Sequence, residues 1–302
     1  MAANILSVQS ISKSFGNLCA LDGVSLDVVG QKVSILIGPN GSGKTTLINV
    51  ISGLYKPDSG KVLFEGEDVT GSQPFKLYKL GMGRTFQIPA LFWKLTVLEN
   101  LLVAEKRNPG ESFFGPLQIV GFQSWRDFFA PWTSLSSIIR KLIREISVKS
   151  FFKSLLPAFA NSWRTFFTPT WAESEKRTIE KASRILELLG LSSLWDQPSH
   201  VLSGGQMKLV EIGRALMSDA KLLLLDEPVS GVNPTLAHEI FSRILKLRDE
   251  LGLTFFIVEH RLDIALKYVD EMFVMALGKV IASGPPVEVM NNKKVIEAYL
   301  GG

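Results

Sequence analysis

Short unbroken runs of apolar residues mark the first elements of this chain. Val33–Ile37 leads directly into a glycine-rich loop, whereas Leu222–Leu225 and Leu253–Val258 each lead into acidic residues. Runs of this length without alternating polar residues are typical of strands buried on both faces of a parallel sheet. We therefore expect a parallel sheet whose strands end in residues that can carry chemistry.

Helical patterns lie between these strands. A helix is expected from Lys44 to about Ser52 and another over Met207–Met217, and Thr96–Glu99 has the spacing of a capping box at a helix start. Three strand-like segments precede residue 38, and a further strand is expected over 61–64. Strands that alternate with helices predict the α/β class with a mainly parallel core.

The composition changes between residues 108 and 171. These 64 residues hold 14 of the chain's 29 aromatic side chains. Within them, Ser134–Lys149 places apolar residues at helical spacing with basic residues largely on other faces, which predicts a basic amphipathic helix. Because prolines interrupt the rest of the segment, we expect an insertion of several short helices.

Overall composition and charge narrow the class of protein. The chain has 302 residues, of which 46% are hydrophobic, enough for a substantial core. Its 33 basic and 29 acidic residues are too balanced to favour nucleic acid binding by charge alone. Cys19 is the only cysteine, the first 15 residues lack the pattern of a signal peptide, and no run of 18 apolar residues occurs. We expect a cytoplasmic globular protein that does not span a membrane by itself.

The glycine-rich loop after the first apolar run predicts a phosphate-binding site. It fits the pattern G-x-x-x-x-G-K-[ST] and consists of Gly38, Pro39, Asn40, Gly41, Ser42, Gly43, Lys44, Thr45 and Thr46. Backbone N–H groups can surround phosphates, Lys44 can reach the β and γ groups, and the Thr45 hydroxyl can ligate Mg²⁺. The alternative is a plain glycine-rich turn. A strand before the loop and a helix start after it favour the phosphate site.

Acidic residues and a histidine follow the other two apolar runs. Asp226 can hold Mg²⁺, and Glu227 can orient or deprotonate an attacking water. His260 follows the next strand at the same expected sheet edge, where its ring can donate a hydrogen bond to a γ-phosphate. An acidic turn and a structural histidine are the alternatives at these positions.

A second glycine-containing run, Leu202–Gln206, precedes the predicted helix 207–217 and has the sequence Leu-Ser-Gly-Gly-Gln. With the phosphate loop, it resembles the ATP-binding cassette (ABC) family, whose signature motif has this sequence. The resemblance implies a P-loop ATPase domain with a mainly parallel sheet, an antiparallel β subdomain and an α-helical subdomain that carries the signature. It also implies head-to-tail dimers, in which the signature residues contact the ATP held by the partner's phosphate loop: Ser203, Gly204, Gly205 and Gln206.

The family resemblance assigns further site residues. Phe15 lies where the family places an aromatic residue that stacks on adenine, although a core position is the alternative. Gln87 matches the glutamine that senses Mg²⁺ and the attacking water. The implied metal ligands are Thr45, Gln87 and Asp226. The implied catalytic residues are Glu227, His260, Gln87 and Lys44. Asn233 departs from the family, because many members have aspartate there.

Four segments resemble the ATPase subunits of branched-chain amino acid importers: Gly83–Gln87, Leu95–Ala104, Gly231–Pro234 and Val295–Leu300. Urea or amide and lipopolysaccharide transporter ATPases share parts of this pattern and remain alternatives. The resemblance implies ATP and Mg²⁺ as cofactors, two transmembrane permease subunits, a second ATPase subunit in a homo- or heterodimer, and indirectly an external solute-binding protein. It places the chain peripherally at the cytoplasmic face of the membrane, without a nucleic acid partner.

We expect residues 1–302 to form one ABC ATPase domain. Residues 1–107 and 172–302 would form the core and helical subdomain, with 270–302 as C-terminal strands and helices, and 108–171 as the insertion. Residues 123–170 carry seven Lys or Arg against two Asp or Glu, with ten aromatic residues. This composition suits contact with an anionic membrane surface or a permease loop, and a lobe packed on its own domain is the alternative.

Two rival functions belong to other classes. A soluble ABC ATPase that acts on DNA or ribosomes usually has tandem cassettes or a long heptad coiled coil, and this sequence has neither. A phosphoryl-transfer kinase would keep the phosphate loop but would leave the signature and His260 unexplained.

Overall fold

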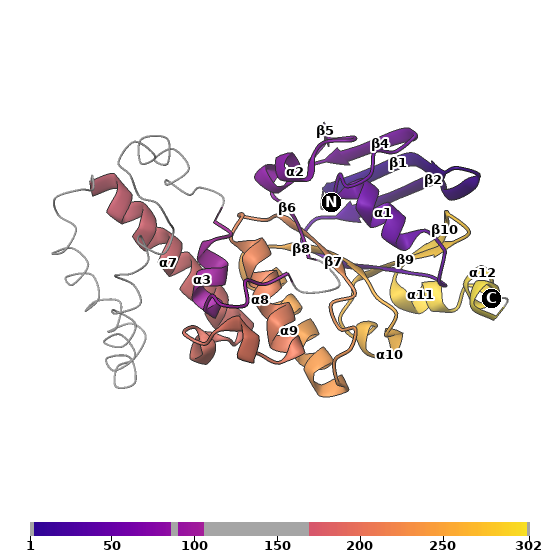
Figure 1. The fold of residues 1–302 in the computed structure, drawn as a ribbon. Helices are drawn as coiled ribbons and strands as arrows, with labels where there is room; N and C mark the ends of the chain where they lie inside the picture. Colours follow the sequence, from indigo (N-terminus) through magenta and orange to yellow (C-terminus); the bar gives the residue numbers. More distant parts are fainter. Residues whose placement is uncertain (1–2, 86–89, 106–168, 301–302) are drawn as a thin grey trace. The chain divides into compact units, whose positions relative to one another are not determined.

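The computed structural model describes residues 3–85, 90–105 and 169–300 (Figure 1). The chain divides into two compact units, residues 1–106 with 180–302, and residues 107–179. The site lies in the first unit, which is described below. Gln87, the predicted helix Ser134–Lys149 and nearly all of the predicted insertion 108–171 lie outside the described residues.

A six-stranded sheet forms the centre of the first unit, in the order β10-β9-β3-β8-β7-β6. Its strands are β3 (Val33–Ile37), β6 (Met82–Arg84), β7 (Leu222–Asp226), β8 (Thr254–Val258), β9 (Glu271–Ala276) and β10 (Lys279–Gly284). Neighbours from β9 to β6 pair in parallel, and β10 pairs antiparallel with β9. The three apolar runs of the sequence are thus confirmed as parallel strands.

A second, four-stranded sheet is antiparallel, with the order β2-β1-β4-β5. It consists of β1 (Asn4–Phe15), β2 (Leu18–Val29), β4 (Ser59–Phe64) and β5 (Glu67–Asp68). This sheet is the antiparallel subdomain that the family resemblance implied.

Helices cover both faces of the parallel sheet (Figure 1). They are α1 (Lys44–Ile51), α2 (Pro74–Leu80), α3 (Val97–Leu102), α7 (Pro169–Leu189), α8 (Gly204–Leu216), α9 (Pro234–Leu251), α10 (Leu262–Ala265), α11 (Pro286–Met290) and α12 (Lys293–Leu300), with 3-10 turns at η2 (Ser192–Leu194) and η3 (Ser199–Val201). Within the described ranges, no helix is both long and apolar enough to cross a membrane.

Successive residues of the central strands contribute to two separate apolar cores. On β8, Phe255 and Ile257 pack with α8 and α9, whereas Phe256 and Val258 pack with α1 and the antiparallel sheet. All four side chains are at most 1% exposed. Because both faces are covered, both sets of alternating positions must be apolar, which explains the unbroken runs in the sequence.

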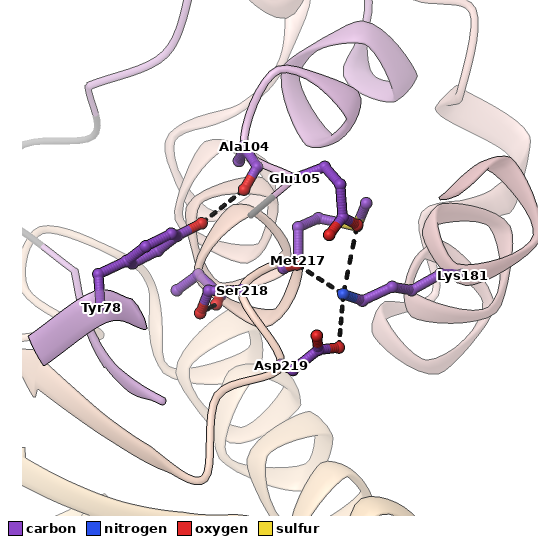
Figure 2. A network of polar contacts seen from close by, with 8 residues as sticks. Tyr78, Ala104, Glu105, Lys181, Met217, Ser218 and Asp219 are labelled. Atoms are coloured by element: carbon purple, nitrogen blue, oxygen red, sulfur yellow. Dashed lines mark hydrogen bonds and ion pairs between the residues drawn. The ribbon is translucent and has the colours of Figure 1, made fainter. Parts of the chain in front are cut away.

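A polar cluster joins elements on either side of the segment 106–168, which the structure does not describe (Figure 2). Lys181 of α7 forms ion pairs with Glu105 at 3.3 Å and Asp219 at 2.7 Å. Its ammonium also donates to the carbonyl of Met217 at 2.5 Å. Lys181 thereby ties the chain just after α3 to the loop between α8 and β7.

Candidate nucleotide site

The parallel sheet brings the predicted site residues to one edge. Strands β6, β7, β8 and β3 are neighbours and run in the same direction, so their carboxyl ends lie together. The phosphate loop follows β3, Asp226 ends β7, and His260 lies two residues beyond β8. Such an edge is the usual ligand site of open α/β sheets.

The phosphate loop is shaped by glycines at conformations that other residues avoid. Gly38, Gly41 and Gly43 have φ angles of 152°, 78° and 101°. A Cβ atom at Gly38 would overlap the carbonyl oxygen of Met275, and one at Gly43 would lie 2.5 Å from the carbonyl oxygen of Ala20. The loop therefore packs tightly against β9 and β2, and only glycine fits at these two positions.

Lys44 lies inside the phosphate loop. Its ammonium donates to the carbonyl oxygens of Gly38 and Pro39, both at 2.9 Å. Burial lowers the pKa of Lys44, and the Glu227 and Asp226 carboxylates oppose this shift. The ammonium thus faces the acidic end of β7 from within the loop.

Two observations test whether the loop fits a bound phosphate. The hydroxyl of Ser42 is buried and has no hydrogen-bond partner in the part of the chain that the structure describes. The helix α1 begins directly after the loop, at Lys44, and carries no acidic residue in its first turn. Thr45 is exposed and Thr46 half-buried at this positive helix end. An unpartnered hydroxyl and a free helix start both suit an anion.

Asp226 and Glu227 have different surroundings. Asp226 is buried and pairs with Arg84 at 3.3 Å. Burial raises the pKa of Asp226, and the Arg84 guanidinium opposes this shift. Glu227 leaves the strand with φ of 51°, an uncommon angle for a non-glycine residue, and its carboxylate lies 3.2 Å from His260 Nε2.

Two charged residues hold the loops of the site in place. No role was predicted for either of them from the sequence. Glu259 is 1% exposed, and its carboxylate accepts N–H groups from Val229 at 2.8 Å and from His260 at 2.9 Å. Lys208 of α8 donates to the carbonyls of Glu227 at 2.9 Å and Ser230 at 2.7 Å. Burial lowers the pKa of this ammonium. Backbone contacts of this kind leave no sequence motif, although Glu259 does follow a predicted strand.

The signature residues form a capped helix start. Ser203 Oγ accepts the N–H of Gln206 at 3.3 Å, and the Gln206 side chain accepts the N–H of Ser203 at 2.9 Å. A Cβ atom at Gly205 would lie 2.6 Å from Leu236 Cγ, whereas one at Gly204 would meet nothing within 4 Å. No hydrogen bond among the described residues joins this helix start to the phosphate loop of the same chain. The signature helix start is therefore not held to its own nucleotide loop by any hydrogen bond among the described residues.

Phe15 lies at the end of β1 and is 44% exposed, which argues against a core position. Its ring packs edge-to-face against Tyr55, with 5.4 Å between ring centroids and 73° between planes. The Lys13 ammonium lies 5.6 Å from the Phe15 ring centroid. An exposed, supported ring of this kind can stack on a nucleobase.

Asn233 has a structural role in the loop after Glu227. Its side chain caps α9 by accepting the N–H of Leu236 at 2.9 Å, and Pro234 occupies the first helical position. Asparagine and aspartate are equally good N-caps, so the departure from the family pattern preserves the helix start while it removes a charge.

The phosphate loop, the acidic strand end and the capped Leu-Ser-Gly-Gly-Gln helix define an ATP-binding cassette. Comparison with known proteins agrees: residues 21–230 match the ABC transporter family, and residues 279–302 match the branched-chain amino acid ATP-binding cassette transporter family. The chain belongs to the ABC transporter family and, within it, to the LivG type of ATP-binding protein. It is accordingly an ABC-type ATPase.

Similar proteins cover almost the whole chain. "Probable branched-chain amino acid transport ATP-binding protein LivG" of Archaeoglobus fulgidus is 43% identical over 98% of this chain and 95% of the relative. The protein of the same name from Methanocaldococcus jannaschii is 44% identical over 98% of this chain and 97% of the relative. A crystal structure of the ADP conformation of an ABC transporter cassette superposes with a TM-score of 0.71, at 41% identity, over 99% of this chain and all (100%) of that chain.

Proposed function

We infer that this chain is the ATP-binding subunit of a branched-chain amino acid importer. Its similarity to LivG proteins extends over nearly the full length, and the match over 279–302 is to a family named for branched-chain amino acids. The observation that carries the mechanism is the capped signature helix, whose N–H groups have no partner in their own phosphate loop. The chain therefore contributes one half to each of two different ATP sites.

The first half-site is the phosphate loop. Lys44 would exchange the carbonyls of Gly38 and Pro39 for β and γ phosphate oxygens, and the Ser42 hydroxyl would gain a partner. Phe15 would stack on the adenine ring, as its exposed face allows. The loop N–H groups of 40–45 and the hydroxyl of Thr46 would complete the phosphate contacts.

The donor set beside the loop fits Mg²⁺. The hydroxyl of Thr45 and the carboxylate of Asp226 are hard oxygen ligands of the kind that this ion prefers, and Gln87 is the third ligand that we propose. When bound, Mg²⁺ neutralises phosphate charge and orients the γ-phosphoryl group. The guanidinium of Arg84 already balances the charge of Asp226. The Asp226 carboxylate would therefore stay in place between this guanidinium and Mg²⁺.

Glu227 is the base of the proposed reaction. It would take a proton from the attacking water as the water oxygen bonds to the γ-phosphorus. The bond between the γ-phosphorus and the oxygen that bridges it to the β-phosphate would break, and this oxygen would leave with ADP. His260, 3.2 Å from the Glu227 carboxylate, would hold this side chain in position and donate to the γ-phosphate. Lys208 and Glu259 fix the two loops that carry these groups. Lys44 would stabilise the charge of the transition state.

The second half-site is the signature. In a head-to-tail dimer, the N–H groups and hydroxyl of 203–206 would close over the γ-phosphate in the partner's loop. Binding of ATP then joins two ATPase subunits, which are identical or related, and hydrolysis releases them. We propose that this cycle drives two transmembrane permeases at the cytoplasmic face of the membrane, supplied by an external solute-binding protein. Residues 123–170 would contact the membrane surface or the permeases.

The variant Glu227→Gln tests the catalytic part of this proposal. It should retain ATP binding, lose turnover by about 100-fold or more, and accumulate an ATP-bound dimer on size-exclusion chromatography. Glu239→Gln, at an exposed position on α9, is the matched control and should keep wild-type turnover. Unchanged turnover in Glu227→Gln would show that another group is the base, and a monomer in saturating ATP would argue against shared sites.

A further inference from the structure

The turn after β7 must hold the backbone of Glu227 in an unfavourable conformation. The φ angle of 51° lies in the left-handed region, which costs free energy for a residue that has a side chain. The Glu227 N–H donates to the carbonyl of Val258 at 2.9 Å, and the Glu227 carbonyl accepts the N–H of Ser230 at 3.1 Å. The direction of the Glu227 side chain therefore depends on the contacts of its own peptide groups.

Lys208 bonds to both ends of this turn from another element. It lies in α8 and is 9% exposed. Its ammonium donates to the carbonyls of Glu227 at 2.9 Å and Ser230 at 2.7 Å. Because the donor is charged, these hydrogen bonds are stronger than those between neutral groups. Lys208 therefore closes the turn that carries Glu227.

The helix that supplies Lys208 also begins with the signature. Lys208 lies four residues after Gly204, about one helical turn from the start of α8. This start is packed on α9, since a Cβ atom at Gly205 would lie 2.6 Å from Leu236 Cγ. Lys208 thus joins the helix end that would contact the partner's ATP to the turn that carries the base for the chain's own ATP.

We propose that Lys208 is a positioning residue for Glu227, and that it makes the position of this base depend on the signature helix. When the signature meets the partner's ATP, a shift of α8 moves the Lys208 ammonium and with it the turn over residues 227–230. The base is then set for hydrolysis in the closed dimer. The inference rests on the proposed function, because it takes Glu227 as the base and the signature as part of the partner's site.

Lys208→Met tests the effect on the base, because it removes the ammonium and keeps the aliphatic chain. The kcat of the purified complex should fall about tenfold or more, since the base is no longer held at the attacking water. The dissociation constant for ATP should change by less than about twofold, because both hydrogen bonds of Lys208 go to the turn after β7.

The double variant with Glu227→Gln separates this role from a structural one. If Lys208 acts through the base, Lys208→Met should leave the residual turnover of Glu227→Gln unchanged in single turnovers of radiolabelled ATP. The ATP-bound dimer of the double variant should form at the same ATP concentration as that of Glu227→Gln. A loss of turnover by the same factor in both backgrounds would show that Lys208 supports the fold and not the base.

Hydrogen exchange tests the link to the signature helix. In the Glu227→Gln background, the amides of residues 227–230 should exchange more slowly in the ATP-bound dimer than without nucleotide. Lys208→Met should remove this difference while the dimer still forms. Equal protection with and without Lys208→Met would show that the signature helix does not act on the base through Lys208.

Lys246→Met is the matched control, since Lys246 forms an exposed ion pair on α9, and it should keep wild-type turnover. Wild-type turnover of Lys208→Met would overturn the role of Lys208. Wild-type turnover of Glu227→Gln, or a wild-type chain that binds no ATP, would instead contradict the proposed function itself.

Discussion

At the scale of single residues, the two glycines of the signature have opposite reasons to be glycine. Gly205 is buried, and a Cβ atom there would lie 2.6 Å from Leu236 Cγ. Gly204 is exposed and has open space around it. The fold itself therefore requires glycine only at 205. Nothing in the fold requires glycine at 204. In our account the partner's ATP approaches the chain at this position.

The substitutions Gly204→Ala and Gly205→Ala should distinguish an effect on ATP binding by the partner from an effect on the stability of the fold. Gly204→Ala should leave stability unchanged or raise it by about 0.5 kcal/mol, because alanine favours the helix, while ATP-driven dimerisation and turnover fall. Gly205→Ala should lower the free energy of unfolding by about 1–3 kcal/mol, because Leu236 must move. Urea unfolding and ATPase assays measure both effects. Wild-type turnover of a folded Gly204→Ala protein would contradict a shared site.

Sequence motifs predicted part of the site, whereas the rest depends on contacts between residues that are far apart in the sequence. The phosphate loop, the acidic strand end and His260 follow from local patterns, since each adjoins an apolar strand in the sequence. Arg84 and Asp226 pair across 142 positions, and Glu259 receives N–H groups from another loop, so no local pattern could indicate either role. The roles of Gln87 and the other site residues stay predictions.

At the scale of elements, Lys181 connects segments that are far apart in the sequence. Its ammonium lies against Glu105, Met217 and Asp219, and the Glu105 side chain is only 8% exposed (Figure 2). Loss of the ammonium would leave the buried Glu105 carboxylate without this cation, which is costly even when other contacts remain.

Lys181→Met, which keeps the aliphatic chain and removes the charge, should therefore lower the free energy of unfolding by about 1–3 kcal/mol. Lys246→Met is a matched control on α9, where the ion pair with Glu250 is exposed and contributes at most about 0.5 kcal/mol. The midpoints of urea unfolding give the comparison. Equal midpoints for Lys181→Met and Lys246→Met would show that the cluster adds no stability.

The sequence predicted β3, β7 and β8 and the starts of α1 and α3, because burial on both faces and capping residues leave local signals. The helix expected over 207–217 begins three residues earlier, at Gly204. Thr96 and Ser203 both form capping boxes, and α1 begins at Lys44 as expected. The strand orders of the two sheets were not predictable, since partners such as β3 and β8 lie more than 200 positions apart in the chain. The predicted insertion 108–171 stays a prediction.

At the scale of the whole molecule, our proposal is that one chain carries two incomplete ATP sites. The phosphate loop lies at the carboxyl edge of the parallel sheet, and the signature begins α8 without a hydrogen bond to that loop among the described residues. ATP would therefore act both as the ligand that joins two subunits and as the fuel that separates them. The match to LivG proteins over nearly the full chain assigns this cycle to amino acid import.

Transport by the assembled complex tests this account most directly. The complex should be purified through this chain, reconstituted in liposomes that contain ATP, and supplied outside with its solute-binding protein and radiolabelled leucine, isoleucine or valine. We predict accumulation of at least one of these amino acids that depends on internal ATP and Mg²⁺ and is lost in the Glu227→Gln complex. Purification without polytopic membrane proteins, or uptake of none of the three amino acids above the Glu227→Gln level, would contradict the account.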